Sequence, residues 1–397
     1  MADVVDESPQ SPQQRCQFRP GGKICPLPVR QGASFCGAHD AARPECPACG
    51  TRLRDAAALK KHVTARCPVT RRRRVAQQAN WYSASTNLPP PSTANNIPVA
   101  RALPLVLHTL QTALPAPRKM RAPAALPELR LISDAWSDQR DSSVKMQPKH
   151  FTQIASLCAL ALSSHTPSQP HQPAVIELGA GRAYTAMFAA NVLSLRDDPP
   201  HVLVTDRHTT RWKADRTLRA WQSTGKIASF TRCTTDLADL DMRRLPFLQT
   251  CNRVYILGKH LCGDASDLAI YGATRLARHL HQHANDTPAV ITLVLACCCR
   301  ALCTDRTYTF DQCLKPHISP SEFAAITPCC ALGLDEKRRN KPHLGNQCRL
   351  LIDSARVQWM NANGWQAALC TYTKVSPENT CIVATWNPNK LTNANLS

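Results

Sequence analysis

No stretch of the sequence contains about 18 consecutive apolar residues, and this lack excludes a helix that crosses a membrane. The first ten residues are acidic and polar, so we do not expect them to form a signal peptide. A protein that is not secreted rarely carries a framework of disulfides. The 20 cysteines are therefore expected to be metal ligands or buried thiols.

The composition limits the fold class and the partner. The 397 residues are enough for two or three domains, and a hydrophobic content of 43% excludes wholesale disorder. Lysine and arginine (48) exceed aspartate and glutamate (28), and the formal net charge of +20 favours binding to a polyanion such as nucleic acid. Residues 11–74 contain 14 of the basic residues, three acidic residues and six cysteines, and so carry +11 of this charge.

The basic segment begins with a cluster of metal-binding residue types. Its first four candidate ligands are Cys16, Cys25, Cys36 and His39. Thiolates and neutral imidazole are the ligands of tetrahedral zinc, and so short a segment would need the metal to fold. The sequence therefore predicts a structural zinc site, although four reduced side chains in a surface loop are the alternative.

A second set of candidate zinc ligands follows directly. It consists of Cys46, Cys49, His62 and Cys67. A helix expected over 55–65 would present the histidine to the Cys-Pro-x-Cys-Gly turn, which is the order of a small zinc finger. Basic residues surround this finger and end in the run 71–74. They are expected to contact phosphates, but a solvated basic face or a nuclear import signal would give the same pattern.

From residue 141 onward, short apolar strands alternate with amphipathic helices. Strands are expected at 175–178, 202–206, 253–257, 289–297 and 380–385. Helices are expected at 150–162, 184–195, 211–221, 264–280 and 347–361. This alternation predicts an α/β domain with a mostly parallel sheet and helices on both faces.

The first strand of this domain leads into a glycine turn that is typical of a cofactor site. Gly179 and Gly181 follow the acidic Glu177, but Tyr184 breaks the Gly-x-Gly-x-x-Gly dinucleotide fingerprint. An acid there suits the ammonium group of S-adenosylmethionine. Later strand ends carry Asp206, suited to ribose hydroxyls, and Asp236, suited to the adenine edge. Another nucleotide-binding or hydrolase domain with acidic strand ends is the alternative.

The segment 258–264 is expected to be a loop at the functional end of the next strand. Lys259 and His260 could remove a proton from a ribose hydroxyl or stabilise its developing charge. A phosphate contact for Lys259 and a helix cap for His260 are the alternative. The nearby cysteines are Cys262, Cys297, Cys298, Cys299 and Cys303. They allow a cysteine nucleophile for base methylation, a further metal cluster, or simple buried thiols.

The order of these motifs resembles one family, the eukaryotic tRNA 2′-O-methyltransferases that act on the fourth nucleotide of the acceptor stem. Besides the two fingers, the matching motifs are Lys149-His150-x-x-Gln153-x-x-Ser156, Glu177-Leu178-Gly179-Ala180-Gly181, Asp206-Arg207, Lys259-His260-Leu261-Cys262-Gly263, Leu351-Ile352-Asp353-x-x-Arg356 and Ser376-Pro377-Glu378-Asn379. Two departures stand out. Arg52 occupies the position of a finger histidine, and Arg300-Ala301 replaces two histidines that follow a strand in the family.

The resemblance implies a Rossmann-like, S-adenosylmethionine-dependent methyltransferase sheet preceded by two small zinc-binding modules. The expected parts are a CCCH-type finger at 14–41, a second finger at 44–70, a basic and then proline-rich linker at 71–140, and the methyltransferase domain at 141–390. The implied partner is the tRNA acceptor stem, with no membrane and no obligate protein partner, in the cytoplasm, the nucleus or both. Three rival hypotheses stay open. They are a non-catalytic RNA-binding protein with a decayed methyltransferase domain, a cysteine-dependent RNA base methyltransferase, and a nuclear zinc-finger factor acting on DNA or pre-mRNA.

Overall fold

The computed structural model describes the larger part of the chain. The described residues are 43–70 without 49, 54, 68 and 69, then 130, 132–134, 146–163, 172–196, 199–207, 214–283, 289–305, 314, 318–334 and 342–386. The expected first finger, Cys49 and most of the expected linker lie outside them. Internal contacts divide the chain into two units, Met1–Gln78 and Ala79–Ser397.

The described part of the N-terminal unit is a short turn followed by a helix. Its elements are α1 (Ala56–Lys61) and the π-helical turn η2 (His62–Arg66). Asp55 caps α1, because its carboxylate accepts a hydrogen bond from the amide of Ala58 at 2.7 Å. The expected helix over 55–65 is therefore present, with a change of helical pitch at His62.

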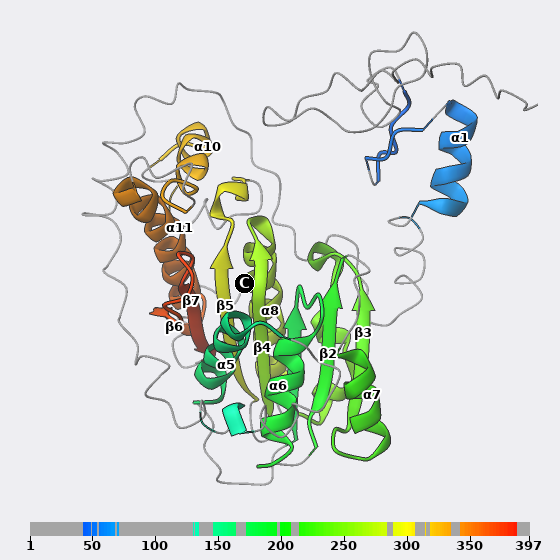
Figure 1. Cartoon of the computed structure of the whole chain (residues 1–397), viewed down its shortest axis with the longest axis vertical. Helices are drawn as coiled ribbons and strands as arrows, with labels where there is room; N and C mark the ends of the chain where they lie inside the picture. Colours follow the sequence, from blue (N-terminus) through cyan, green and yellow to red (C-terminus); the bar gives the residue numbers. More distant parts are fainter. Residues whose placement is uncertain are drawn as a thin grey trace, which may run out of the picture. The chain divides into compact units, whose positions relative to one another are not determined.

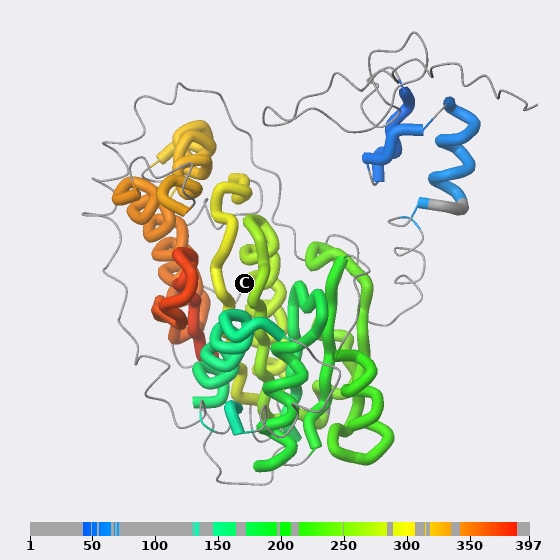
Figure 2. Tube along the Cα trace, in the orientation of Figure 1, coloured from blue at the N-terminus to red at the C-terminus, as the bar shows by residue number. Residues whose placement is uncertain are grey.

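The C-terminal unit is built on a seven-stranded sheet in the order β3-β2-β1-β4-β5-β7-β6 (Figure 1). The strands are β1 (Pro173–Leu178), β2 (His201–Asp206), β3 (Ser229–Thr234), β4 (Arg253–Cys262), β5 (Val290–Cys298), β6 (Trp365–Thr371) and β7 (Thr380–Trp386). Strands β1 to β5 are parallel, and β7 runs antiparallel to both of its neighbours. Strand β7 thus lies beside β5, as the red segment next to the yellow one in Figure 2 shows.

Helices cover both faces of the sheet (Figure 1). They are α5 (Pro148–Leu162), α6 (Tyr184–Leu193), α7 (Asp215–Ser223), α8 (Asp264–Gln282), α10 (Pro320–Cys329) and α11 (Pro342–Ala362). Successive strand side chains point to opposite faces. Val175 and Val202 therefore pack with α5, α6 and α7, whereas Ile176 and Leu203 pack with α8, α10 and α11.

The expected α/β fold with helices on both faces is confirmed, and each expected strand is present. The expectation for the segment after Leu257 was wrong. It is not a loop, because β4 continues to Cys262 and pairs with β5 there. The edge strand β6 and helix α10 were not expected. Among the described helices, none is long and apolar enough to cross a membrane.

Candidate active site

The candidate residues of the C-terminal unit gather at the carboxyl edge of the sheet. They are Glu177 near the end of β1, Asp206 at the end of β2, Lys259 and His260 on β4, and Cys298 at the end of β5. Parallel strands all end at the same edge, and ligands of open α/β sheets bind in the crevice outside it. The sheet order therefore brings together groups that are far apart in the sequence.

The glycine turn after β1 lies against the end of β4. Gly179 has a φ of +64°, and a Cβ atom there would lie 2.8 Å from Cδ2 of Leu261. Only glycine fits both the backbone conformation and this close approach. Gly181 also has a positive φ, of +48°, with open space where its Cβ atom would be. The turn thus exposes backbone at the crevice.

Glu177 fastens this turn to the helix that follows. The side chain is buried, at 3% exposure, and its Oε2 accepts a hydrogen bond from the amide of Ala186 at 2.7 Å. Burial raises the pKa of Glu177 to about 7, against the opposing effect of the hydrogen bonds from Ala186 and Thr185. The hydrogen bond from Ala186 places the carboxylate at the N-terminus of α6. The helix dipole favours a negative charge there, and so it opposes the effect of burial.

Asp206 is tied to the same turn, whereas Asp236 caps a separate one. Oδ2 of Asp206 accepts a hydrogen bond from the amide of Gly181 at 2.9 Å. Oδ1 of Asp236 accepts one from the amide of Ala238 at 3.0 Å, at the start of the 3-10 turn Leu237–Asp239. The structure thus connects Asp206 directly to the glycine turn and places Asp236 just after β3, the outer neighbour of β2.

A β-bulge carries the two catalytic candidates. Lys259 and His260 lie opposite the single residue Ala296 of β5, because the register shifts between Gly258 and Leu261. Bulges of this kind bend a strand and turn its side chains in a new direction, and they are common beside active sites. Lys259 is buried here and His260 is exposed.

The electrostatics of this bulge favour neutral side chains. Nζ of Lys259 lies 3.1 Å from Nε2 of His260. Burial lowers the pKa of Lys259, while interactions with Glu177 and Cys298 raise it. Although part of His260 reaches solvent, partial burial lowers its pKa to about 4, and the charges of Lys259 and His150 act in the same direction. Both groups therefore lose their protons more readily than usual.

Sequence reasoning missed His150 as a site residue. It lies on α5, and its own pKa is lowered by burial and then by the charge of Lys259. The signal was available in the Lys149-His150 pair of the helix motif, but α5 is more than 90 residues away from β4 in the sequence. Only the packing of α5 against the sheet brings the two basic groups into electrostatic contact.

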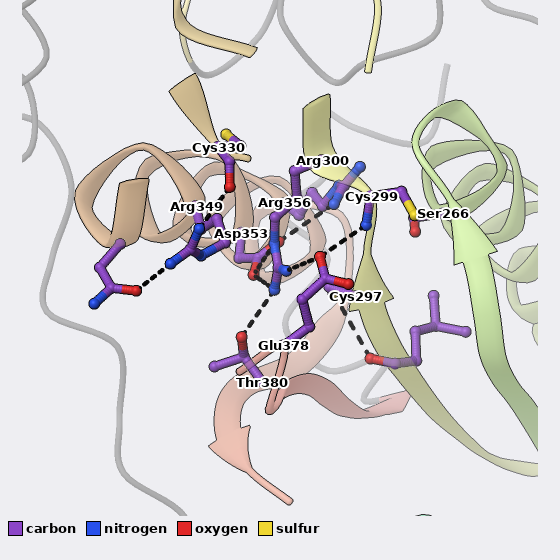
Figure 3. Close-up of polar contacts among 12 residues, drawn as sticks. Ser266, Cys297, Cys299, Arg300, Cys330, Arg349, Asp353, Arg356, Glu378 and Thr380 are labelled. Atoms are coloured by element: carbon purple, nitrogen blue, oxygen red, sulfur yellow. Dashed lines mark hydrogen bonds and ion pairs between the residues drawn. The ribbon is translucent and has the colours of Figure 1, made fainter. Parts of the chain in front are cut away.

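A buried ionic network joins the turn after β5 to α11 and β7 (Figure 3). Nη2 of Arg300 lies 2.6 Å from Oδ2 of Asp353 on α11, and the same Nη2 donates to Thr380 at 2.8 Å. Arg356 pairs with Asp267 on α8 at 2.7 Å. Arg300 therefore has a structural role, because it joins the loop after β5 to α11 and β7.

The described residues contain two groups of three potential metal ligands. The first is Cys46, His62 and Cys67 in the N-terminal unit, and the second is Cys262, Cys298 and Cys299 at the ends of β4 and β5. In each group the ligand atoms lie within 4.8 Å of one another. The first group contains three of the four ligands expected for the second finger. For the cysteines of the second group, the sequence had left three possibilities open: a nucleophile, a metal cluster or simple buried thiols.

The thiol of Cys262 is exposed and has an unusual environment. Hydrogen bonds from Cys298 and Cys299 lower the pKa of Cys262 to about 6, against the opposing effect of burial. By contrast, burial raises the pKa of Cys297 and that of Cys303 to about 12. Cys262 is therefore the cysteine of this region that most readily forms a thiolate.

The sheet order, the antiparallel β7 and the glycine turn at the first strand define an S-adenosylmethionine-dependent methyltransferase fold. Sequence comparison gives the family. The chain belongs to the methyltransferase TRM13 family, whose sequence model matches residues 152–342 and 332–385.

Several named relatives share this similarity at low identity. The chain is 25% identical to the tRNA:m(4)X modification enzyme TRM13 of Vanderwaltozyma polyspora, over 53% of this chain and 56% of that protein. It is 24% identical to the enzyme of the same name from Eremothecium gossypii, over 94% and 95% of the two chains. The TRM13 homolog of Mus musculus is also 24% identical, over 64% of this chain and 67% of that protein. The match to the first relative thus spans little more than half of its length.

Proposed function

We propose that this protein transfers a methyl group from S-adenosylmethionine to a ribose 2′-hydroxyl at position 4 of the tRNA acceptor stem. One observation carries the proposal. The glycine turn, tied to Asp206, meets the bulge that holds Lys259 and His260 at one edge of a methyltransferase sheet. The names of the TRM13 relatives support tRNA as the substrate.

The residues at the glycine turn fit the cofactor. Gly179 and Gly181 allow its methionine part to approach the backbone, and Asp206 is placed to accept hydrogen bonds from ribose hydroxyls. Glu177 supplies negative charge below the turn, and Asp236 marks the adenine end. When bound, S-adenosylmethionine supplies an electrophilic methyl group on its sulfonium.

Lys259 is the proposed catalytic base, with His260 as the second choice. Burial favours the neutral amine of Lys259, which can accept the proton of the attacking 2′-hydroxyl. Glu177 favours the charged form of Lys259, and so stabilises the ammonium that this transfer produces. His260, with a pKa of about 4, is neutral at physiological pH and can orient the amine.

The N-terminal unit is proposed to hold the RNA by means of two zinc fingers. Cys46, His62 and Cys67 fit one zinc ion, with Cys49 as the fourth ligand, because the two described sulfurs are 3.7 Å apart. Cys16, Cys25, Cys36 and His39 are proposed to bind the second zinc ion. Lys60 and Lys61 are exposed at the end of α1 and are suited to phosphate contacts along an A-form stem. Such an enzyme is expected in the cytoplasm, the nucleus or both.

The test is methyl transfer to unmodified tRNA by the purified full chain. After incubation with isotopically labelled S-adenosylmethionine, nucleosides from digested tRNA are separated and weighed by mass spectrometry. We expect the label in a 2′-O-methylated nucleoside, and fragment mapping should place it at position 4. A tRNA without its acceptor stem should not be labelled.

Two variants test the role of Lys259 in methyl transfer. Lys259→Met should reduce the rate by about 100-fold or more and leave cofactor binding intact. Lys226→Met is the matched control, because Lys226 precedes β3 at the amino ends of the parallel strands, opposite the proposed site, and bonds to Asn191.

A methyl label on a nucleobase would favour the cysteine-dependent enzyme. Binding of tRNA and cofactor without any product would favour the non-catalytic protein.

A further inference from the structure

Three thiols meet at the ends of two neighbouring strands, next to the proposed active site. Cys262 ends β4 and Cys298 ends β5, and the two residues are direct partners in the parallel pairing of these strands. Their sulfurs are 3.6 Å apart. The thiol of Cys299 joins them, with all three sulfurs within 4.8 Å of one another.

The backbone at Cys299 has an unusual conformation that makes this convergence possible. Consecutive residues of a strand point to opposite faces, so Cys298 and Cys299 would normally diverge. Cys299 instead has a φ of +49°, in the left-handed region that non-glycine residues rarely adopt. Glu378 holds this turn, because its Oε1 accepts a hydrogen bond from the amide of Cys299 at 2.9 Å (Figure 3). An unfavourable conformation held in this way is typical of a functional position.

The distances between the sulfurs fit a metal better than a disulfide. A disulfide needs about 2.05 Å between its sulfurs. Zinc holds thiolates at about 2.3 Å in tetrahedral geometry, and two sulfurs at that distance from one ion are about 3.8 Å apart. The separation of 3.6 Å between Cys262 and Cys298 is close to this value. It also matches the 3.7 Å between Cys46 and Cys67 in the proposed finger.

The loops that carry the thiols are held in place and remain open to solvent. A Cβ atom on Gly263 would lie 2.6 Å from the carbonyl oxygen of Leu302, so the two loops touch at their backbones. Thr304 donates to both carboxylate oxygens of Asp264, at 2.7 and 2.9 Å, and fixes the start of α8 to the same loop. Cys262 itself is exposed, so an ion can reach the group from solvent.

From this arrangement we propose that Cys262, Cys298 and Cys299 bind a zinc ion through three thiolates, with water as the fourth ligand. Binding releases the remaining thiol protons to solvent, and no electron transfer is involved. The ion ties the ends of β4 and β5 together directly after the bulge that carries Lys259. The site differs from both fingers, since it lies in the C-terminal unit, and it does not depend on the substrate proposed above.

The test is the zinc content of the full chain, measured by mass spectrometry of the metal after equilibration at one fixed free zinc concentration. Cys262→Ser and Cys298→Ser should each contain one zinc ion fewer per chain than the wild type. Cys370→Ser is the matched control, because Cys370 also lies opposite a cysteine, Cys381, on a neighbouring strand but is in neither group of potential ligands. Circular dichroism verifies that each variant is folded.

Cobalt substitution gives a second readout that does not depend on counting. In a chain that already carries Cys67→Ser, which disables the proposed second finger, the sulfur-to-cobalt charge-transfer absorption should fall further when Cys262→Ser is added. Equal zinc content and equal cobalt spectra with and without Cys262→Ser would overturn the proposal. So would a Cys262–Cys298 disulfide found by peptide mapping in protein that was purified with zinc and without reductant.

Discussion

Arg300 and Asp353 form a fully buried ion pair between the loop after β5 and helix α11. Nη2 of Arg300 lies 2.6 Å from Oδ2 of Asp353, and the two side chains are 0% and 2% exposed. The same carboxylate also lies 3.3 Å from Arg356, so one negative charge joins two buried guanidinium groups. These ion pairs are therefore part of the core of the C-terminal unit.

Asp353→Asn should strongly destabilise the C-terminal unit. Without this carboxylate the buried Arg300 keeps only one described acidic partner, Glu378, 3.5 Å away, and breaking a buried pair costs about 3–5 kcal/mol of unfolding free energy. Urea unfolding followed by circular dichroism measures the loss. Asp134→Asn is the control, because its partner Arg130 is 4.0 Å away and both side chains are largely exposed, so the change should be below about 1 kcal/mol. Equal losses for both variants would contradict the structural role of the network.

Gly179→Ala should damage the glycine turn after β1 more than the same change at a matched turn. Both Gly179 and Gly225 have a positive φ, of +64° and +74°, and an alanine in that region costs about 1–2 kcal/mol. Only at Gly179 does the new methyl group also meet Leu261. We therefore expect Gly179→Ala to be the less stable variant and to bind S-adenosylmethionine more weakly, as measured by calorimetry. A smaller effect at Gly179 would show that the contact with Leu261 relaxes freely.

Glu177→Gln should change how stability depends on pH. Burial raises the pKa of Glu177 in the folded chain to about 7, from an ordinary value of 4.5. Between these values the folded state binds the extra proton, so the contribution of Glu177 to stability is fully present below pH 4.5 and is lost as pH rises towards 7. The wild type should thus lose about 3 kcal/mol relative to Glu177→Gln over this range. Urea unfolding of both proteins at several pH values measures the difference, and the opposite slope would contradict the burial argument.

The pH dependence of methyl transfer should identify the base. If Lys259 accepts the proton, the rate rises with pH as its ammonium ionises, at a pH below the ordinary lysine value of 10.5 because burial lowers its pKa. His260→Ala should then keep this rise. A rise near pH 4 that disappears in His260→Ala would instead assign the role to His260, whose pKa is about 4. Single-turnover rates across the pH range distinguish the two outcomes.

The local sequence predicted much of the fold and part of the site. The helix of 15 residues that ends at Leu162 and the buried strand that ends at Leu178 follow from the spacing of their apolar residues. The glycine turn follows from residues that are adjacent in the chain. The edge strand β6 did not follow, because residues 367–370 form an apolar run without alternation, and its partner β7 is reached only through a return of the chain.

What the sequence determined by itself was therefore the class of fold, the glycine turn and the spacing of candidate ligands, since each depends on residues a few positions apart. The tertiary structure decided which distant groups meet. Arg300 pairs with Asp353, which is 53 residues away in the sequence, and Cys262 lies beside Cys298, which is 36 residues away. These contacts arise because β4 and β5 are neighbours in the sheet and α11 packs on its face, an order that is fixed by the packing of the whole domain.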